Sequence, residues 1–145
     1  MNTPFKYQGI HDCEAVVLSC IDFRFWKDIT KFIEEELEIK SYDFPSLPGA
    51  AKAINACTGK QDLAMSCIGI PCDLHHVKKA VIVNHWDCGA YGGSKSFASA
   101  EAEQTFHESE LRKAKEKINS EYPALEVITA LAKLEGDKIE FLTIQ

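Results

Sequence analysis

Two short stretches of the sequence carry side chains that could do chemistry together. The stretch CIDFR holds Cys20, Asp22 and Arg24 at alternate positions, and the stretch HWDCG holds His85 and Cys88 three residues apart. Two thiolates and one imidazole form a good ligand set for zinc, which is borderline-soft and accepts sulfur and nitrogen in tetrahedral geometry. The residue types therefore indicate a candidate zinc site built from both stretches.

A site with three protein ligands would keep a fourth position for water. Water held there by zinc has a pKa of about 7, which provides hydroxide at neutral pH. Asp22 lies two residues beyond Cys20 and could accept a hydrogen bond at this position, while Arg24 could hold Asp22 by a charge-assisted pair.

Each motif also has an ordinary interpretation when it is taken alone. A cysteine at the end of a strand is more often a core residue than a ligand, and a His-x-x-Cys pair is common by chance. Asp22 and Arg24 could form a surface ion pair worth roughly 0–1 kcal/mol. The two motifs together favour metal binding, because both end apolar runs and both carry zinc-compatible side chains.

The apolar, β-branched runs at residues 15–20 and 79–85 predict two buried strands, and each motif lies at the carboxyl end of one of them. In open α/β sheets, sites form outside these ends where the strand order reverses. If the two strands are neighbours, Cys20 meets His85 and Cys88 at that edge of the sheet.

The rest of the chain supplies the elements of an α/β fold. Trp26, Ile29, Ile33 and Leu37 recur at helical spacing and predict a helix over residues 25–39. The other expected elements are a strand at 39–44, a mostly helical stretch at 50–70 interrupted at Gly59 and ended by Pro71, a helix at 99–119, and two strands joined around Gly136-Asp137. This order predicts a mostly parallel open sheet flanked by helices, with an antiparallel edge strand.

The composition limits the partners and the compartment. The length of 145 residues predicts a single domain over residues 1–145, and the net charge of −6 argues against a nucleic-acid partner. The first 15 residues contain no continuous apolar segment, which argues against a secretory signal or a membrane span. We therefore expect a cytoplasmic chain that uses some of its six cysteines for metal or catalysis, with Cys67 in the core.

Together the two motifs, C-x-D-x-R at Cys20 to Arg24 and H-x-x-C-G at His85 to Gly89, resemble those of the β-class carbonic anhydrases. The resemblance runs from about residue 15 to the end of the chain. It implies a β-carbonic anhydrase-like fold and a zinc-dependent lyase that reversibly hydrates carbon dioxide to bicarbonate and a proton. It also implies that Cys20, His85 and Cys88 bind Zn²⁺ and that Asp22 and Arg24 form a catalytic dyad.

The pocket is expected to be more apolar than is usual in that family. Phe23 stands where the family has Ser, and Asn84 stands where it commonly has Gly. Two other functions stay open: hydrolysis of carbon disulfide or carbonyl sulfide on the same zinc site, and a non-catalytic role in zinc or bicarbonate binding. Gly89 could let backbone amides approach a bound substrate, or could serve the turn alone.

A homodimer or a higher homo-oligomer is expected, with a small-molecule substrate as the only other partner. The resemblance implies paired subunits. In addition, a single domain of this size would struggle to bury Phe23, Phe25, Trp26 and Trp86, which cluster near the motifs.

The remaining histidines are expected to be less important. His75 and His76, just before the second buried strand, could shuttle protons but are expected to be solvated. His107, in the middle of the long helix, is expected at the surface.

Overall fold

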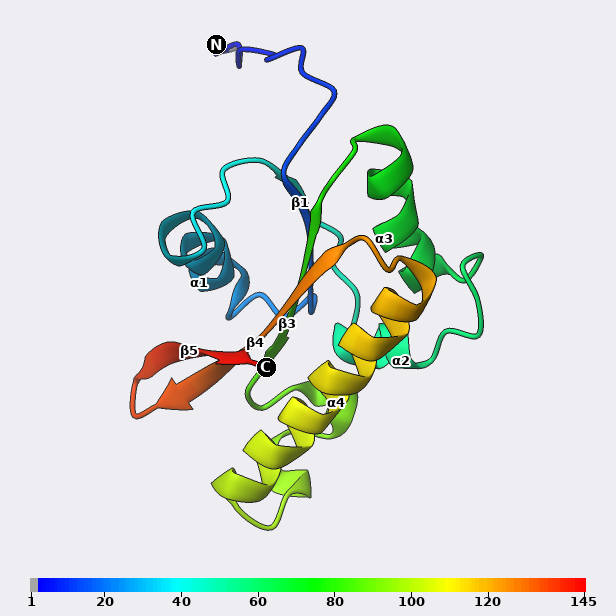
Figure 1. Ribbon diagram of the computed structural model, residues 1–145. Coiled ribbons are helices and arrows are strands. Elements are labelled where there is room, and N and C mark those ends of the chain that lie inside the picture. The colour runs from blue at the N-terminus through cyan, green and yellow to red at the C-terminus, as the bar shows by residue number, and fades with distance from the viewer. Residues whose placement is uncertain (1–2) are drawn as a thin grey trace.

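The computed structural model describes residues 3–145, and a five-stranded sheet forms its centre (Figure 1). Its strands are β1 (Ala15–Ser19), β2 (Tyr42–Asp43), β3 (Lys79–His85), β4 (Glu126–Glu135) and β5 (Lys138–Ile144). They lie in the order β2-β1-β3-β4-β5. The first four run parallel and β5 is antiparallel to β4. The predicted mostly parallel sheet with an antiparallel edge strand is confirmed.

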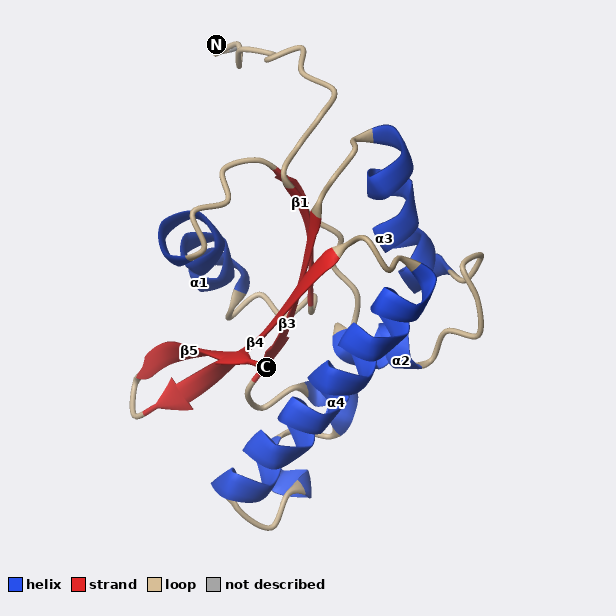
Figure 2. Ribbon diagram, in the orientation of Figure 1, coloured by secondary structure: helices blue, strands red, loops and turns tan. Residues whose placement is uncertain are grey.

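Helices cover both faces of the sheet (Figure 2). On one face lies α1 (Trp26–Lys31), continued by the π-helical turn η1 (Phe32–Glu36). On the other face lie α2 (Ala51–Asn55), α3 (Leu63–Leu74) and α4 (Ala100–Glu121), and the 3₁₀ turns η2 (Gly89–Tyr91) and η3 (Ser94–Ser96) precede α4. Over residues 3–145, none of these helices has both the length and the apolar character that crossing a bilayer requires.

The strands β1 and β3 lie side by side, with Ser19 opposite Val83. All of β1, and all of β3 except Lys79, is buried, because helices cover both faces; this explains the unbroken apolar runs in the sequence. The neighbours β2 and β3 lie on opposite sides of β1, so the strand order reverses here. The carboxyl ends of β1 and β3 therefore open at the same edge, so the adjacency that the sequence left open is present.

The first helix differs from its prediction. It is α-helical only to Lys31, and the backbone N–H of Leu37 then bonds to the carbonyl of Phe32, five residues back. Ile29, Phe32 and Ile33 share the buried face, as positions three and four residues apart do on a helix, whereas Trp26 at the start of α1 is 45% exposed.

The second strand is shorter than expected, with only Tyr42 and Asp43 paired to β1. The reason lies in Glu14, whose carboxylate accepts hydrogen bonds from the backbone N–H groups of Lys40 and Ser41 at 2.8 and 2.9 Å. A side chain therefore satisfies the donors that a longer strand would have used for pairing.

The helical stretch after residue 50 is divided near Gly59 as predicted, but Pro71 does not end it. α3 continues through Pro71 to Leu74. The missing N–H of Pro71 removes one helix hydrogen bond, but the carbonyl of Pro71 still accepts from the N–H of His75 and the last turn is kept. Within α3, Cys67 is half-buried and not a core residue.

The C-terminal elements form as predicted. α4 begins after Ser99, whose side chain accepts a hydrogen bond from the N–H of Ala102 at 3.0 Å. The strands β4 and β5 form a hairpin in which Glu135 faces Lys138, and Gly136 takes the left-handed conformation that the two-residue turn requires.

Candidate metal centre

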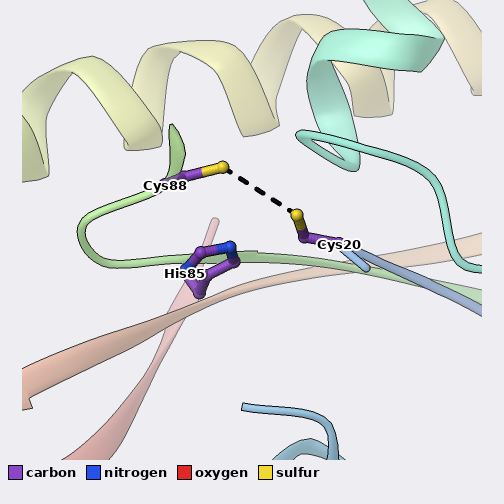
Figure 3. A group of neighbouring side chains, drawn as sticks. All are labelled: Cys20, His85 and Cys88. Carbon is purple, nitrogen blue, oxygen red and sulfur yellow. Dashed lines mark hydrogen bonds between the residues drawn. The ribbon is translucent and has the colours of Figure 1, made fainter. Parts of the chain in front are cut away.

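Cys20, His85 and Cys88 come together at the edge of the sheet, with their ligand atoms all within 4.8 Å of one another (Figure 3). Cys20 follows β1, His85 is the last residue of β3, and Cys88 lies in the loop after it. All three residues are buried. The structure thus brings together the three side chains that the sequence predicted as one cluster.

The spacing of the two sulfur atoms fits a tetrahedral metal site. The Sγ atoms of Cys20 and Cys88 lie 3.9 Å apart. Zinc–sulfur bonds of about 2.3 Å place two sulfurs of a tetrahedron about 3.8 Å apart, whereas a disulfide needs about 2.05 Å. Both cysteines are free, so the sulfur atoms already stand at the separation of two ligands.

The orientation of His85 leaves one ring nitrogen available. Its Nδ1 lies 2.7 Å from the carbonyl oxygen of Trp86. Because a carbonyl only accepts, Nδ1 carries the proton and Nε2 carries the lone pair. Nε2 is buried and has no hydrogen-bond partner among the described residues, and the ring of Phe25 stacks on the imidazole at 4.4 Å. A fixed, unpartnered lone pair beside two sulfurs suits a metal ligand.

A hydrogen bond joins the two thiols. The hydrogen bond between them lowers the pKa of Cys20 and raises the pKa of Cys88, because one sulfur holds the proton while the other accepts it. The backbone N–H of Gly49 also donates to the Cys20 sulfur at 3.4 Å. Removing both thiol protons would place two negative sulfurs side by side, which a bound cation would stabilise.

Asp22 is held beside this cluster by Arg24. The guanidinium donates to Asp22 through Nη2 at 2.6 Å and through Nε at 3.0 Å, and the backbone N–H of Arg24 donates as well. These hydrogen bonds lower the pKa of Asp22 to about 2. Asp22 Oδ2 lies 3.8 Å from Nε2 of His85, so an ionised carboxylate stands next to the free ring nitrogen.

Asp87 holds the other side of Arg24, a contact that the sequence reasoning missed. Arg24 Nη1 lies 3.1 Å from Asp87 Oδ2, and Nη2 donates to the Asp87 carbonyl at 3.1 Å. The place of Asp87 inside the second motif, one residue before Cys88, was the available signal. The guanidinium is thereby clamped between two acidic residues from the two motifs.

A cavity of about 570 Å³ opens onto the cluster. Its lining residues are Cys20, Ile21, Asp22, Phe23, Arg24, Pro48, Gly89 and Ala90. The wall is mainly apolar apart from Asp22 and Arg24, and Phe23 is 81% exposed. Gly89, which the sequence suggested as a substrate contact, lines this cavity, and a Cβ at its position would meet no other atom.

Residues 10–139 match a family model described as "putative carbonic anhydrase". The chain belongs to this carbonic anhydrase family. It is 30% identical over 132 residues to uncharacterized proteins of Rickettsia conorii and Rickettsia bellii, with 88% of this chain matched in both cases and 71% and 80% of those proteins covered.

The fold of this carbonic anhydrase family member is similar to the crystal structure of β-carbonic anhydrase isoform I from Trichomonas vaginalis. The TM-score is 0.60 at 14% identity, and the similarity covers 98% of this chain and 88% of that one. The resemblance to β-class carbonic anhydrases is therefore confirmed for the family and for the fold.

A buried polar network supports the loop that carries Cys88 in this carbonic anhydrase-like fold. Glu103 of α4 is only 2% exposed, and it accepts hydrogen bonds from the N–H of Asp87 at 2.8 Å and from Ser94 Oγ at 3.0 Å. Asn84, before His85, accepts a hydrogen bond from the N–H of Ala51 at 3.1 Å. The loop is therefore fixed from α4, and the end of β3 that carries His85 is fixed from α2.

His107 belongs to this network, so its predicted place at the surface is wrong. It is fully buried, and its Nδ1 lies 3.1 Å from Nδ2 of Asn84. The buried residues of α4 are Glu103, His107, Leu111, Ala114 and Ile118. They recur every three or four residues, and this periodicity was the signal in the sequence that placed His107 on the inner face.

Proposed function

We propose that this protein is a zinc-dependent carbonic anhydrase, which reversibly hydrates carbon dioxide to bicarbonate and a proton. The buried cluster of Cys20, His85 and Cys88 carries the proposal, because its sulfur spacing and the unpartnered Nε2 of His85 fit a tetrahedral metal. Membership of the carbonic anhydrase family supports the reaction.

The ligands in this proposal are the thiolates of Cys20 and Cys88 and Nε2 of His85. Zinc held there would supply the Lewis acidity that brings the pKa of a water molecule to about 7. The protein contributes the arrangement around it. The Trp86 carbonyl fixes the tautomer of His85, and the Gly49 amide stabilises the Cys20 thiolate.

Asp22 orients the attacking oxygen. Because Arg24 keeps the pKa of Asp22 at about 2, the carboxylate is ionised at neutral pH and can only accept a hydrogen bond. An acceptor beside His85 turns the oxygen lone pair toward the carbon of carbon dioxide. The same low pKa makes Asp22 a poor store for the released proton, which therefore passes to buffer.

Arg24 keeps Asp22 in this position. The guanidinium binds both carboxylate oxygens of Asp22, while Asp87 holds the guanidinium in place. Without Arg24, the carboxylate of Asp22 is free to turn toward the cluster and would occupy the fourth ligand position, which the reaction needs for water.

Hydrolysis of carbonyl sulfide or carbon disulfide is the second candidate. The apolar part of the cavity wall, formed by Ile21, Phe23 and Pro48, favours it, because the sulfur atoms of these substrates are larger and less strongly hydrated than the oxygens of carbon dioxide. The same ligands and the same Asp22 would serve both reactions.

The cytoplasm is the proposed compartment. All six cysteines are free, although Cys20 and Cys88 lie close together in space. Free thiols persist where glutathione and thioredoxin keep proteins reduced. A thiolate-bound metal site needs such conditions, because oxidised sulfur is no longer a ligand.

Stopped-flow assays on the zinc-loaded protein test the proposal, with carbon dioxide, carbonyl sulfide and carbon disulfide supplied in turn. We expect hydration of carbon dioxide well above the uncatalysed rate. Hydration at the uncatalysed rate at every pH would contradict it. Turnover of the sulfur compounds in that case would favour the second candidate, and no turnover of any substrate would leave a zinc- or bicarbonate-binding role.

A further inference from the structure

A second group of metal-binding side chains lies far from the first cluster. The ligand atoms of Cys13, Asp43 and His75 all lie within 4.8 Å of one another. Cys13 precedes β1 whereas Cys20 follows it, so the two clusters lie at opposite ends of this strand. The three residues line a surface hollow of about 220 Å³. They take no part in the site described above.

The backbone holds the three segments in place. The N–H of Cys13 donates to the carbonyl of His75 at 3.1 Å, which ties the start of β1 to the end of α3. Asp43 lies in β2 and faces Val16 of β1 in the parallel register. The three side chains are therefore brought together by the fold, although Asp43 is 30 residues from Cys13 and 32 residues from His75 along the chain.

The contacts within the group leave the Cys13 thiol without a strong hydrogen bond. His75 Nδ1 lies 2.6 Å from Asp43 Oδ2, a short charge-assisted contact. Cys13 Sγ lies 3.9 Å from the same oxygen and 3.5 Å from the carbonyl of Ala15, and a thiol is a weak donor at such distances. Burial and the negative Asp43 raise the pKa of the Cys13 thiol. A cation is the charge that would favour the thiolate here.

We propose that Cys13, Asp43 and His75 form a second binding site for a borderline divalent cation such as zinc. One thiolate, one imidazole and one carboxylate are the sulfur, nitrogen and oxygen ligands that zinc accepts. The partly open hollow leaves a further position for water. The site joins three segments, which are the residues before β1, the strand β2 and the end of α3. Its role is to fasten these segments together.

Two of the three distances between ligand atoms need only a small adjustment. Zinc bonds of about 2.0–2.3 Å place nitrogen, oxygen and sulfur ligands about 3.3–3.5 Å apart in a tetrahedron. The Cys13–Asp43 distance of 3.9 Å must shorten, and the His75–Asp43 distance of 2.6 Å must lengthen, each by less than about 1 Å. The His75 and Asp43 side chains are 42% and 31% exposed, which gives them room to rotate.

A neighbouring pair provides a matched control. His76 Nδ1 lies 2.8 Å from Asp12 Oδ1, much as His75 meets Asp43. These two side chains are 63% and 74% exposed, and neither belongs to a group of three ligand atoms among the described residues. We infer that His76 and Asp12 form an ordinary surface pair, so that altering it leaves metal binding unchanged.

Equilibrium dialysis of the full-length protein against zinc, followed by elemental analysis, tests the site. We expect Cys13→Ala and His75→Ala each to hold one zinc per chain fewer than wild type. His76→Asn and Cys67→Ala should hold the wild-type number. Cys88→Ala should lose a different zinc, so that combining it with Cys13→Ala removes both. The expected loss at the second site is therefore the same whether or not the first cluster binds zinc.

Equal zinc in wild type, Cys13→Ala and His75→Ala would overturn the proposal, and loss of zinc in His76→Asn would overturn the assignment of the ligands. His75→Ala replaces a partly exposed side chain, so it should keep the wild-type circular dichroism spectrum. Asp43→Asn gives a second test that preserves shape: its zinc dissociation constant at this site should rise at least about tenfold, because an amide is a weaker ligand than a carboxylate. An unchanged constant would also contradict the proposal.

Discussion

Arg24 holds the carboxylate of Asp22 from one side, and Asp87 holds Arg24 from the other. The guanidinium donates to the carboxylates of Asp22 and Asp87 and to the backbone carbonyl of Asp87. The position of Asp22 beside His85 is therefore fixed by a chain of contacts that joins both sequence motifs. Changes along this chain should alter the reaction without removing a metal ligand.

The first prediction concerns Asp22→Asn. The variant should keep its zinc, because Cys20, His85 and Cys88 remain. Its hydration rate should fall by about 10²–10⁴-fold, the usual contribution of a positioned proton acceptor. Stopped-flow rates at matched zinc content measure the effect. A rate equal to that of wild type would show that Asp22 does not orient the attacking oxygen.

The second prediction compares Arg24→Ala with Asp87→Asn. Arg24→Ala frees Asp22 and should lower the hydration rate strongly. Asp87→Asn should lower it less, because the carbonyl of residue 87 still accepts from the guanidinium. Asn also tolerates the left-handed backbone of this residue, whose φ is 55°. The same rate assay checks the order, and a slower Asp87→Asn than Arg24→Ala would contradict the proposed chain of contacts.

At the scale of elements, α4 packs against β3 through polar as well as apolar contacts. His107 is fully buried and contacts Asn84 of β3, and Glu103 supports the loop after β3. Burial lowers the pKa of His107 to about 4. This buried histidine makes the stability of the fold depend on pH.

The third prediction follows from that pKa. As the pH falls, His107 takes up a proton near pH 6.5 in the unfolded chain but only near pH 4 in the folded chain. The free energy of unfolding is therefore unaffected by His107 above about pH 6.5 and decreases as the pH falls from there toward 4. Between about pH 7.5 and 5.5, His107 should therefore cost the wild type about 1 kcal/mol of unfolding free energy.

Urea unfolding of wild type and His107→Gln at both pH values checks this. Other titrating groups contribute equally to the two proteins, so the wild type should lose about 1 kcal/mol more than the variant on acidification. Equal losses would mean that His107 titrates normally in the folded protein.

The elements around the cluster could be predicted because their signals are local. The apolar runs that end at Cys20 and His85 indicated buried parallel strands, and parallel strands align their carboxyl ends. Ligand types then indicated the metal. The turn at Gly136 and the cap at Ser99 also depend on neighbouring residues alone.

Features that depend on contacts between distant residues could not be predicted in this way. The short β2 follows from the carboxylate of Glu14, which binds amides 26 and 27 residues away. The clamp on Arg24 needs Asp87, which is 63 residues away. Phe32, which begins the π-helical turn after Lys31, stacks its ring on that of Phe141 in β5 at 4.3 Å.

At the scale of the whole molecule, the large apolar residues in and next to the two motifs divide into two groups. Phe25 and Trp86 are buried in the chain itself, whereas Phe23 and Trp26 are 81% and 45% exposed. One chain therefore covers only part of the apolar surface beside its proposed active site. This exposed part supports a homodimer, which remains a proposal here.

The fourth prediction is that sedimentation at micromolar concentration finds a species of at least twice the 16.2 kDa chain mass. Phe23→Ser should weaken this association by removing exposed apolar surface. Leu74 is 64% exposed and ends α3, just before the amino end of β3 and so at the opposite end of the sheet from Phe23, and a substitution there should leave the association unchanged. A wild-type protein that sediments only as the single chain would refute the homodimer.

The most direct test of the central claim measures zinc content and carbon dioxide hydration together in wild type, Cys88→Ala and Cys67→Ala. Cys67 is a half-buried cysteine outside the metal centre and serves as the control. We predict that Cys88→Ala loses one zinc per chain and falls to the uncatalysed hydration rate. Cys67→Ala should keep the wild-type zinc content and the wild-type hydration rate. A Cys88→Ala protein with wild-type zinc content and wild-type hydration rate would contradict the account.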